Sequence, residues 1–129
     1  MILGIGTDIV KTARFKDMTE HFMARVFTPN ERAYLLGKSH VSAAGIFAAK
    51  EAVAKALGTG FRHFWPSCIE VVHDAMGKPY VVLHGEAAHA AAKLTTGDYE
   101  INLSISHTSD DAVAFAVISL KGEVDVSSS

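Results

Sequence analysis

The sequence predicts an α+β fold in which an antiparallel sheet packs against one long central helix. Residues 41–57 are mostly alanine and other apolar residues, which is typical of a buried helix. Branched runs occur mainly after this stretch, and strands that cluster late favour α+β over a doubly wound sheet. The chain has 129 residues, of which 49% are hydrophobic, so it can bury one substantial core. We expect one domain over residues 1–120 and a short polar tail over residues 121–129.

The N-terminal segment predicts a strand followed by an amphipathic helix. Residues 2–7 are branched and closed by glycines, which is typical of a buried strand and places Asp8 at its C-terminal end. Apolar residues then recur at helical spacing, at Phe15, Met18, Phe22 and Met23. Basic residues give this helix a partly basic outer face, at Lys11, Arg14, Lys16 and Arg25.

Two helix boundaries follow from local chemistry. Thr28, Pro29 and Glu31 are an N-cap residue, a proline at the first helical position and a glutamate at the capping-box position. They predict a short helix that ends near Gly37. The central helix should end at Leu57, because Gly58 follows it and glycine is favoured just beyond a helix terminus.

The second half of the chain predicts five further elements. Two branched runs flank a Gly-Lys-Pro turn and form a hairpin, and an alanine-rich helix follows. Two later branched runs, joined by a polar loop, should pair antiparallel. The ranges are 67–73 and 80–83 for the hairpin, 85–94 for the helix, and 100–106 and 112–119 for the last two strands.

Composition restricts the class of protein. The formal net charge of −2 argues against a general nucleic-acid binder. Cys68 is the only cysteine and cannot form an internal disulfide, and the start of the chain lacks a secretory pattern, so we expect a cytoplasmic protein. The longest apolar stretches, such as residues 112–120, are far shorter than the roughly 20 residues that span a bilayer, so we expect no membrane anchor.

The central helix carries charges among apolar neighbours. Glu51 and Lys55 are four residues apart, so an ordinary helical ion pair worth about 0.2–0.5 kcal/mol is one interpretation. A functional role is equally open, because a covered carboxylate is costly unless it is paired or bound to a cation. The stems of Lys50 and Lys55 could converge on a diphosphate. Asp8 alone could simply cap a turn. Two acids with lysines nevertheless suggest a divalent metal that holds a phosphate.

Glycine turns and histidines give weaker signals. Residues 58–60 and 77–79 fit simple turns, although bare backbone in the first turn would also let a ligand approach closely. The seven histidines lack zinc-ligand spacing, and His107 suits a plain turn as well as a ligand donor. The chain has neither a P-loop nor a complete dinucleotide fingerprint.

Several short motifs occur in a specific order along the chain. They are Gly-Ile-Gly-Thr-Asp-Ile at residues 4–9, Arg-Val-Phe-Thr at 25–28 with Glu31, Phe-Ala-Ala-Lys-Glu-Ala at 47–52 with Lys55, Gly-Thr-Gly at 58–60, Gly-Lys-Pro at 77–79, and Ser-Ile-Ser-His-Thr at 104–108. With this order and spacing the chain resembles the holo-acyl-carrier-protein synthases, the small single-domain phosphopantetheinyl transferases. The resemblance covers nearly the whole chain, from Ile2 to Ile118.

The resemblance implies an enzyme that moves the 4′-phosphopantetheine arm of coenzyme A onto a serine of apo acyl carrier protein and leaves adenosine 3′,5′-bisphosphate. It implies Mg²⁺ as the cofactor, bound by Asp8 and Glu51, with diphosphate oxygens and water as further ligands. Lys55 would hold the leaving phosphate, with Lys50 nearby. The serine proton would go to a metal-bound water or to Glu51, and the sequence does not choose between them. The nucleotide pocket would be lined by Gly58, Thr59, Gly60, Lys78, Pro79, His107 and Thr108.

The resemblance also implies partners. Family members of this size form homotrimers with active sites between subunits, so Asp8 would come from one chain and His107 from its neighbour. The basic N-terminal face independently suggests an acidic protein partner, and the main candidates for contact with acyl carrier protein are Arg14 and Arg25. The pathway implied is fatty acid biosynthesis.

Two positions depart from the family pattern. At the first, His21, family members are often more basic, which suggests weaker partner binding. The second is Ile46. Many members carry an arginine just before the Phe-Ala-Ala-Lys-Glu-Ala run, in a place suited to the 3′-phosphate of coenzyme A, whereas this chain has Ile46. Arg62 or His63 could substitute for it. The departure at Ile46 also supports an alternative hypothesis, a non-catalytic trimeric scaffold that binds a nucleotide or a carrier domain.

Overall fold

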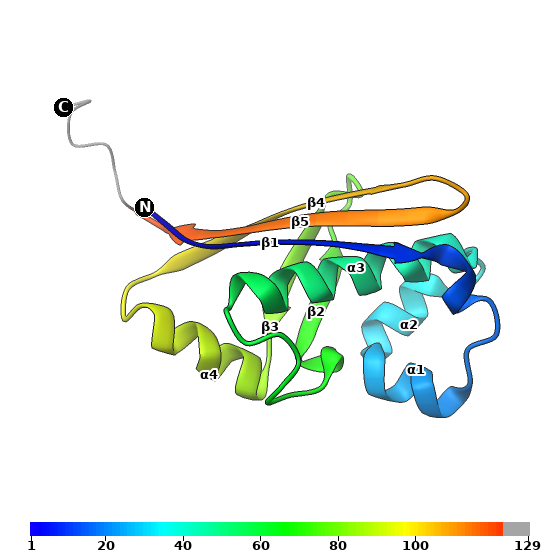
Figure 1. Ribbon diagram of the computed structural model, residues 1–129, viewed down its shortest axis with the longest axis horizontal. Helices are drawn as coiled ribbons and strands as arrows, with labels where there is room; N and C mark the ends of the chain where they lie inside the picture. The colour runs from blue at the N-terminus through cyan, green and yellow to red at the C-terminus, as the bar shows by residue number, and fades with distance from the viewer. Residues whose placement is uncertain (123–129) are drawn as a thin grey trace.

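A three-stranded antiparallel sheet lies along one side of a long helix, α3 (His40–Ala56), and the other elements pack on the opposite side of that helix (Figure 1). The structure is a computed structural model that describes residues 1–122. The sheet has the order β1 (Ile2–Lys11), β5 (Asp111–Leu120) and β4 (Tyr99–His107). The predicted α+β class is confirmed, as is the antiparallel pairing of the last two strands. The predicted tail lies outside the described residues from position 123 onward.

β1 is longer than the sequence predicts. It pairs with β5 as far as Lys11, so Asp8 lies within the strand, opposite Ala114, and not at its end. The glycines that suggested an early end have another role. A Cβ atom on Gly4 would lie 2.0 Å from the carbonyl oxygen of Ala56, and one on Gly6 would lie 1.8 Å from that of Ala52. Glycine is therefore required at both positions for β1 to lie on the backbone of α3.

Small residues continue this contact across the sheet. Side chains alternate between the two faces of a strand, so Asp8 shares the face of Gly4 and Gly6 and points toward α3. The residues of β5 that face α3 are mostly alanines and are completely buried, at Ala112, Ala114 and Ala116. The close approach of sheet and helix thus fixes Asp8 against the C-terminal half of α3.

The outer face of β1 and β5 carries exposed apolar side chains. Ile5, Ile9 and Phe115 are 61%, 67% and 54% exposed, and they alternate with the residues that face α3. An apolar surface of this kind on a single chain commonly marks a protein contact.

The N-terminal helix is the main element that the sequence misassigned. Instead of one amphipathic helix over the predicted apolar positions, the chain forms a 3₁₀ turn (Thr12–Phe15) and then a separate helix, α1 (Glu20–Val26). The break arises because the hydroxyl of Thr19 accepts a hydrogen bond from the backbone N–H of Phe22 and starts a new helix. The predicted basic face is correspondingly divided between the strand end, the turn and α1.

The remaining elements agree with prediction. The next helix, α2 (Pro29–Leu35), begins with the expected capping box of Thr28 and Glu31. β2 (Ile69–His73) and β3 (Pro79–Leu83) form the antiparallel hairpin, and a short 3₁₀ turn (Pro66–Cys68) precedes it. The last helix is α4 (Gly85–Leu94). Among residues 1–122, no helix combines the length and apolar character needed to cross a membrane.

A buried ion pair joins α3 to α2 and the hairpin. The ammonium group of Lys50 lies 2.6 Å from Glu31 Oε1, and both side chains are fully buried. Lys50 also donates to the carbonyl oxygens of Pro66 and Ile69, while Glu31 Oε2 accepts from the backbone N–H of Val71 at 2.7 Å. Burial lowers the pKa of Lys50, and the carboxylate of Glu31 partly offsets this effect. Each charge therefore depends on the other.

We expect Gly6→Ala to destabilise the protein by about 1–3 kcal/mol or more, because the new methyl group would collide with backbone that has no room to move. Thermal or urea unfolding measures the effect. Gly97→Ala is the matched control, because its Cβ would meet its nearest neighbour at an ordinary 3.6 Å. Equal stabilities of the two variants would contradict the proposed backbone contact.

We expect Lys50→Met to cost about 3–5 kcal/mol in the free energy of unfolding, because it leaves the buried carboxylate of Glu31 without its partner. Lys55→Met is the control on the same helix. The Lys55 side chain is 50% exposed, so its ion pair should contribute no more than about 1 kcal/mol. If denaturant unfolding shows the same cost for both variants, the buried charges of Lys50 and Glu31 do not depend on each other.

Candidate active site

Three of the predicted site residues meet where β1 crosses the end of α3. Lys55 donates from Nζ to Asp8 Oδ1 at 3.1 Å and to the carbonyl oxygen of Thr7 at 3.0 Å. Glu51 lies one helical turn before Lys55 and therefore on the same face of α3. The Asp8 side chain is 15% exposed. The prediction that Asp8, Glu51 and Lys55 act together is consistent with this arrangement.

The electrostatics of this cluster favour a bound cation. Burial raises the pKa of Glu51, and the negative charge of Asp8 raises it further, while Lys55 and Arg14 act in the opposite direction. Two carboxylates that disfavour each other's charge are stabilised by a positive ion between them.

The protein side chains of this cluster supply only some of the ligands that a Mg²⁺ ion needs. Within residues 1–122 no three His, Cys, Asp or Glu side chains come together to hold a metal. Two carboxylates would suffice where the other ligands are phosphate oxygens and water, because Mg²⁺ prefers hard oxygen donors and retains several waters. Asp8 and Glu51 therefore fit a Mg²⁺ ion that binds with a diphosphate.

A glycine turn follows Lys55 directly. Gly58 and Gly60 have φ angles of +86° and +57°, and a Cβ atom at either would meet nothing within 4 Å. The backbone N–H groups of this turn close the helix by bonding to the carbonyl oxygens of Lys55 and Ala54. The hydroxyl of Thr59 donates to the carbonyl oxygen of Gly60. The turn thus presents bare backbone beside Lys55, as a site for close approach of a ligand requires.

The other predicted pocket residues lie in or beside a separate cavity, away from the acidic cluster. Pro79 and His107 line a cavity of about 190 Å³ between α2, α3, the hairpin and β4. Lys78 and Thr108 adjoin these residues in sequence but do not line the cavity. Thr108 uses its hydroxyl to accept the backbone N–H groups of Asp110 and Asp111. The complete lining is Tyr34, Ser42, Gly45, Ile46, His73, Gly77, Pro79, Ile105 and His107.

The acidic cluster and the His107 cavity lie on opposite sides of α3. Ile46 of the cavity and Lys55 of the acidic cluster are nine positions apart, which is a rotation of about 180° around a helix. Asp8 belongs to one edge strand of the sheet, β1, and His107 to the other, β4. One chain therefore does not bring the acidic cluster and the His107 cavity together.

Lys50 is not accessible to a ligand, contrary to the sequence-based expectation. Its ammonium group is fully buried and already bound to Glu31 and to two carbonyl oxygens. Successive helical residues point about 100° apart, so Lys50 faces the protein interior while Glu51 faces the site. Among the predicted pocket residues, Lys50 is thus the one that is buried.

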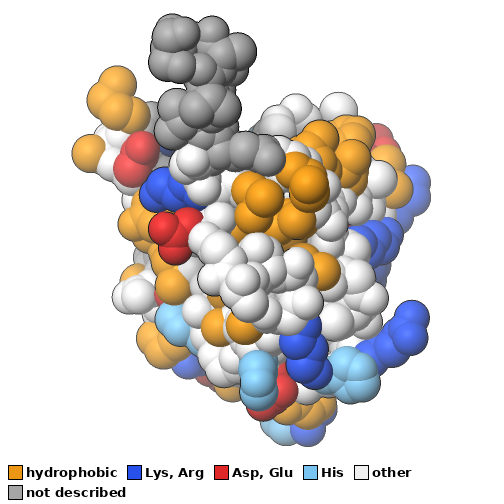
Figure 2. Space-filling view, turned by 90° about the vertical axis from the view of Figure 1, so that its left-hand side faces the viewer, with side chains coloured by type: hydrophobic (Ala, Val, Ile, Leu, Met, Phe, Trp, Pro, Cys, Tyr) orange, Lys and Arg blue, Asp and Glu red, His pale blue; other side chains and the backbone are white. Residues whose placement is uncertain are grey.

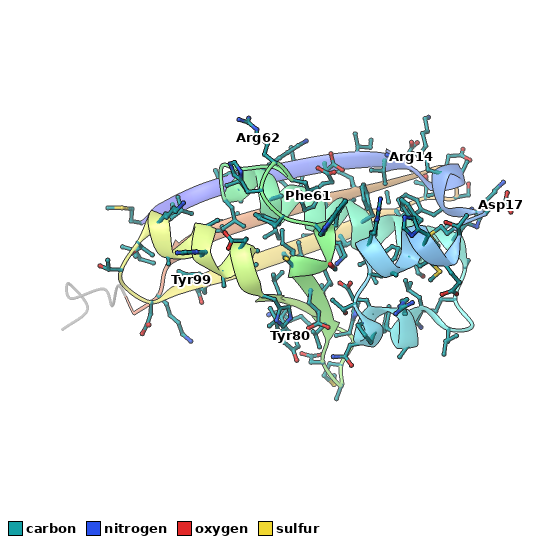
Figure 3. All side chains as sticks on the ribbon, turned by 90° about the horizontal axis from the view of Figure 1, so that it is seen from below. Arg14, Asp17, Phe61, Arg62, Tyr80 and Tyr99 are labelled. Atoms are coloured by element: carbon teal, nitrogen blue, oxygen red, sulfur yellow. The ribbon has the colours of Figure 1, made fainter. Side chains whose placement is uncertain are left out.

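The guanidinium groups of the two arginines predicted to bind a partner lie over aromatic rings. The guanidinium of Arg14 lies 5.4 Å from the ring centroid of Phe47, and that of Arg25 lies 4.8 Å from the ring of Trp65. Arg14 also acts on the charge of Glu51, so it lies near the acidic cluster. Figure 3 shows Arg14 and Arg62 on the side of the molecule where β1 lies, with Tyr80 of β3 on the opposite side.

Three features were not predicted. Trp65 is 58% exposed and lies beside Arg25, and Tyr34 and His73 line the cavity of His107. A larger cavity of about 460 Å³ lies between the glycine turn and α4, where His63 and His89 are among the lining residues. Figure 2 shows histidine and charged side chains gathered on the lower part of this end of the molecule. Sequence spacing gave no signal for these groups, because each joins segments that are distant along the chain.

Comparisons with known proteins show the family of this chain. Residues 4–116 match the family described as the 4′-phosphopantetheinyl transferase superfamily. The chain is 48% identical over 123 residues to a holo-[acyl-carrier-protein] synthase of Clostridium tetani, with 92% of this chain and 96% of that relative covered.

Two solved structures are similar along most of their length. One is a holo-(acyl-carrier-protein) synthase from Bacillus anthracis in complex with CoA (3′,5′-ADP), with 37% identity, a TM-score of 0.74, and 92% and 96% of the two chains covered. The other is a holo-[acyl-carrier-protein] synthase from Neisseria meningitidis, with 38% identity, a TM-score of 0.78, and 92% and 99% covered. The chain belongs to the 4′-phosphopantetheinyl transferase superfamily.

Proposed function

We propose that this protein transfers the 4′-phosphopantetheine arm of coenzyme A to a serine of apo acyl carrier protein and releases adenosine 3′,5′-bisphosphate. The observation that carries this proposal is the meeting of Asp8, Glu51 and Lys55 beside an open glycine turn, in a chain of this superfamily. A relative that is 48% identical to this chain over 123 residues is named holo-[acyl-carrier-protein] synthase. Within this proposal, the reaction serves fatty acid biosynthesis in the cytoplasm.

Mg²⁺ is the cofactor in this proposal, held by the carboxylates of Asp8 and Glu51. When bound, it would neutralise negative charge on the diphosphate of coenzyme A. The chain's own contribution is to keep two acids close together in a partly buried place, where the raised pKa of Glu51 reflects burial and their mutual repulsion. This arrangement makes the pair a receptor for a cation.

The transfer needs no covalent intermediate on the protein. The serine oxygen forms a bond to the β-phosphorus of coenzyme A, and the bond from that phosphorus to the bridging oxygen breaks. The electron pair leaves with adenosine 3′,5′-bisphosphate, where Lys55 donates hydrogen bonds to the phosphate oxygens. The serine proton passes to a carboxylate oxygen of Glu51 or to a water molecule held beside it.

We further propose that the working enzyme is a homotrimer whose sites lie between subunits. Coenzyme A would then contact the acidic cluster and the glycine turn of one copy together with Pro79, His107 and the adjoining Lys78 and Thr108 of the next. The separation of the two groups on opposite sides of α3 supports this arrangement. The exposed apolar side chains on the outer face of β1 and β5 offer a surface through which copies could associate.

Arg14 and Arg25 are the proposed contacts for the acyl carrier protein. Arg14 lies near Glu51, so a carrier protein bound there would present its serine close to the acids. Arginine is well suited to carboxylates, because its planar group can make two parallel hydrogen bonds. The exposed ring of Trp65 beside Arg25 adds apolar contact area to this surface.

The proposed reaction is tested by intact-protein mass spectrometry of apo acyl carrier protein after incubation with this protein, coenzyme A and Mg²⁺. We expect the carrier to gain the mass of one phosphopantetheine arm, and we expect EDTA to prevent the gain. If several apo carrier proteins gain no mass in the presence of folded protein, the alternative of a non-catalytic trimeric scaffold is favoured.

Glu51→Gln should abolish transfer and raise the melting temperature of the metal-free protein. The pKa of Glu51 is higher in the folded state than in the unfolded state, so its ionised form destabilises the fold, and this cost disappears as pH falls through the raised pKa. Glutamine removes the cost at neutral pH. The exposed Glu86→Gln is the control and should change neither property. An active Glu51→Gln variant, or one that melts earlier than wild type, would contradict the assignment.

The shared site predicts complementation between inactive variants. Asp8→Ala and His107→Ala should each lose most activity, because each damages every site of its own trimer. Mixed trimers, formed by unfolding and refolding the two variants together, should regain activity at sites that combine an intact Asp8 with an intact His107. Refolded single variants serve as controls. If the mixture remains as inactive as its components, the site lies within one chain.

A further inference from the structure

The cavity of His107 contains an imidazole in an unusual setting, that of His73. This ring at the end of β2 is stacked on Tyr34 of α2, with ring centroids 3.9 Å apart and an interplanar angle of 2°. The ammonium group of Lys38 lies 4.6 Å from the centroid of the Tyr34 ring. The stack holds His73 in one orientation at the wall of the cavity, which is the preorganisation that a binding group requires.

The two ring nitrogens of His73 are not equivalent. Nδ1 is buried and has no hydrogen-bond partner among the described residues. A second N–H at this position would be a buried donor without an acceptor, which is rarer and costlier than a bare acceptor. This favours a neutral ring with its proton on Nε2, in line with the lowering of the pKa of His73 by burial and by the charge of Lys38, while the carboxylate of Asp74 acts in the opposite direction. Nε2–H is left as a free donor.

The chemistry of the cavity points to an anion. Its lining contains no carboxylate, and its side-chain donors are the hydroxyls of Tyr34 and Ser42 and the imidazoles of His73 and His107. Ile46 contributes only apolar surface. A phosphate group can accept hydrogen bonds from several such donors at once. Because Ile46 cannot supply a charge, recognition falls to the donors that surround it.

We propose that His73 donates a hydrogen bond from Nε2 to the 3′-phosphate of coenzyme A, and that His73 and His107 together replace a fixed cation at position 46. The inference rests on the proposed function in taking coenzyme A as the ligand. Arg62, which the sequence suggested as a substitute, is not among the residues that line the cavity, and Figure 3 shows it pointing outward on the β1 side. His73 thus determines specificity for nucleotides that carry a 3′-phosphate.

The test is isothermal titration of the folded protein with adenosine 3′,5′-bisphosphate and with 5′-AMP, which lacks the 3′-phosphate. We expect wild type to bind the bisphosphate at least about tenfold more tightly, as a hydrogen bond to a charged group allows. His73→Phe keeps a ring against Tyr34 but has no nitrogen, and it should reduce the preference to near one. His73→Gln retains an N–H donor and should restore part of it. A purely structural role would weaken binding of both nucleotides equally.

Two controls make the outcome specific. Arg62→Ala should leave the preference unchanged, and circular dichroism should show that every variant is folded. An unchanged preference in His73→Phe would overturn the proposal, as would loss of the preference in Arg62→Ala alone. The titration does not depend on turnover. Phosphopantetheine transfer without the nucleotide preference would refute this inference alone, whereas the preference without transfer would refute the proposed reaction.

Discussion

The close contact between the backbone of β1 and the backbone of α3 is the constraint on which the rest of the structure depends. Gly4 and Gly6 have no room for a side chain, because the carbonyl oxygens of α3 occupy that space. The contact sets the register in which Asp8, two residues after Gly6, reaches Lys55. The small alanine side chains of β5 allow the rest of the sheet to approach α3 closely as well. The same backbone contact therefore determines both the packing of the core and the geometry of the acidic cluster. A change that moves β1 away from α3 would alter both.

α3 carries a buried charge and a charge near the sheet, which point in different directions from the helix. Lys50 points inward and connects α3 to α2 and the hairpin through Glu31, whereas Glu51 points toward β1. The internal pair fixes the rotation of the helix about its axis, because burial of Lys50 in any other direction would leave an unpaired charge. That rotation places Glu51 and Lys55 on one side and Ile46 on the other. The buried ion pair of Lys50 and Glu31 thus determines which residues of α3 face the acidic cluster and which face the His107 cavity.

The sequence correctly predicted the elements whose signals lie within a few neighbouring residues. The capping box of Thr28, the alanine-rich helices and the hairpin turn at Gly77 all form as expected, because their signals lie within a few residues. The sequence also singled out Glu51 and Lys55 as charges on an apolar helix and Asp8 as an acid near the end of a predicted strand, and the structure brings these three residues together. The length of β1 and the role of Lys50 could not be predicted, because both depend on contacts with distant segments. The stack of Tyr34 and His73 joins residues from α2 and β2 and leaves no pattern in the sequence.

The central claim is that one coenzyme A molecule is held by the acidic cluster of one copy and the His107 cavity of another. The most direct measurement is a crystal structure with coenzyme A and Mn²⁺ in place of Mg²⁺, because anomalous scattering locates the metal. The account predicts a metal peak at Asp8 and Glu51 and the adenosine 3′-phosphate beside His73 and His107 of the adjacent subunit. A metal peak away from these two carboxylates, or a ligand whose contacts all come from one chain, would contradict it.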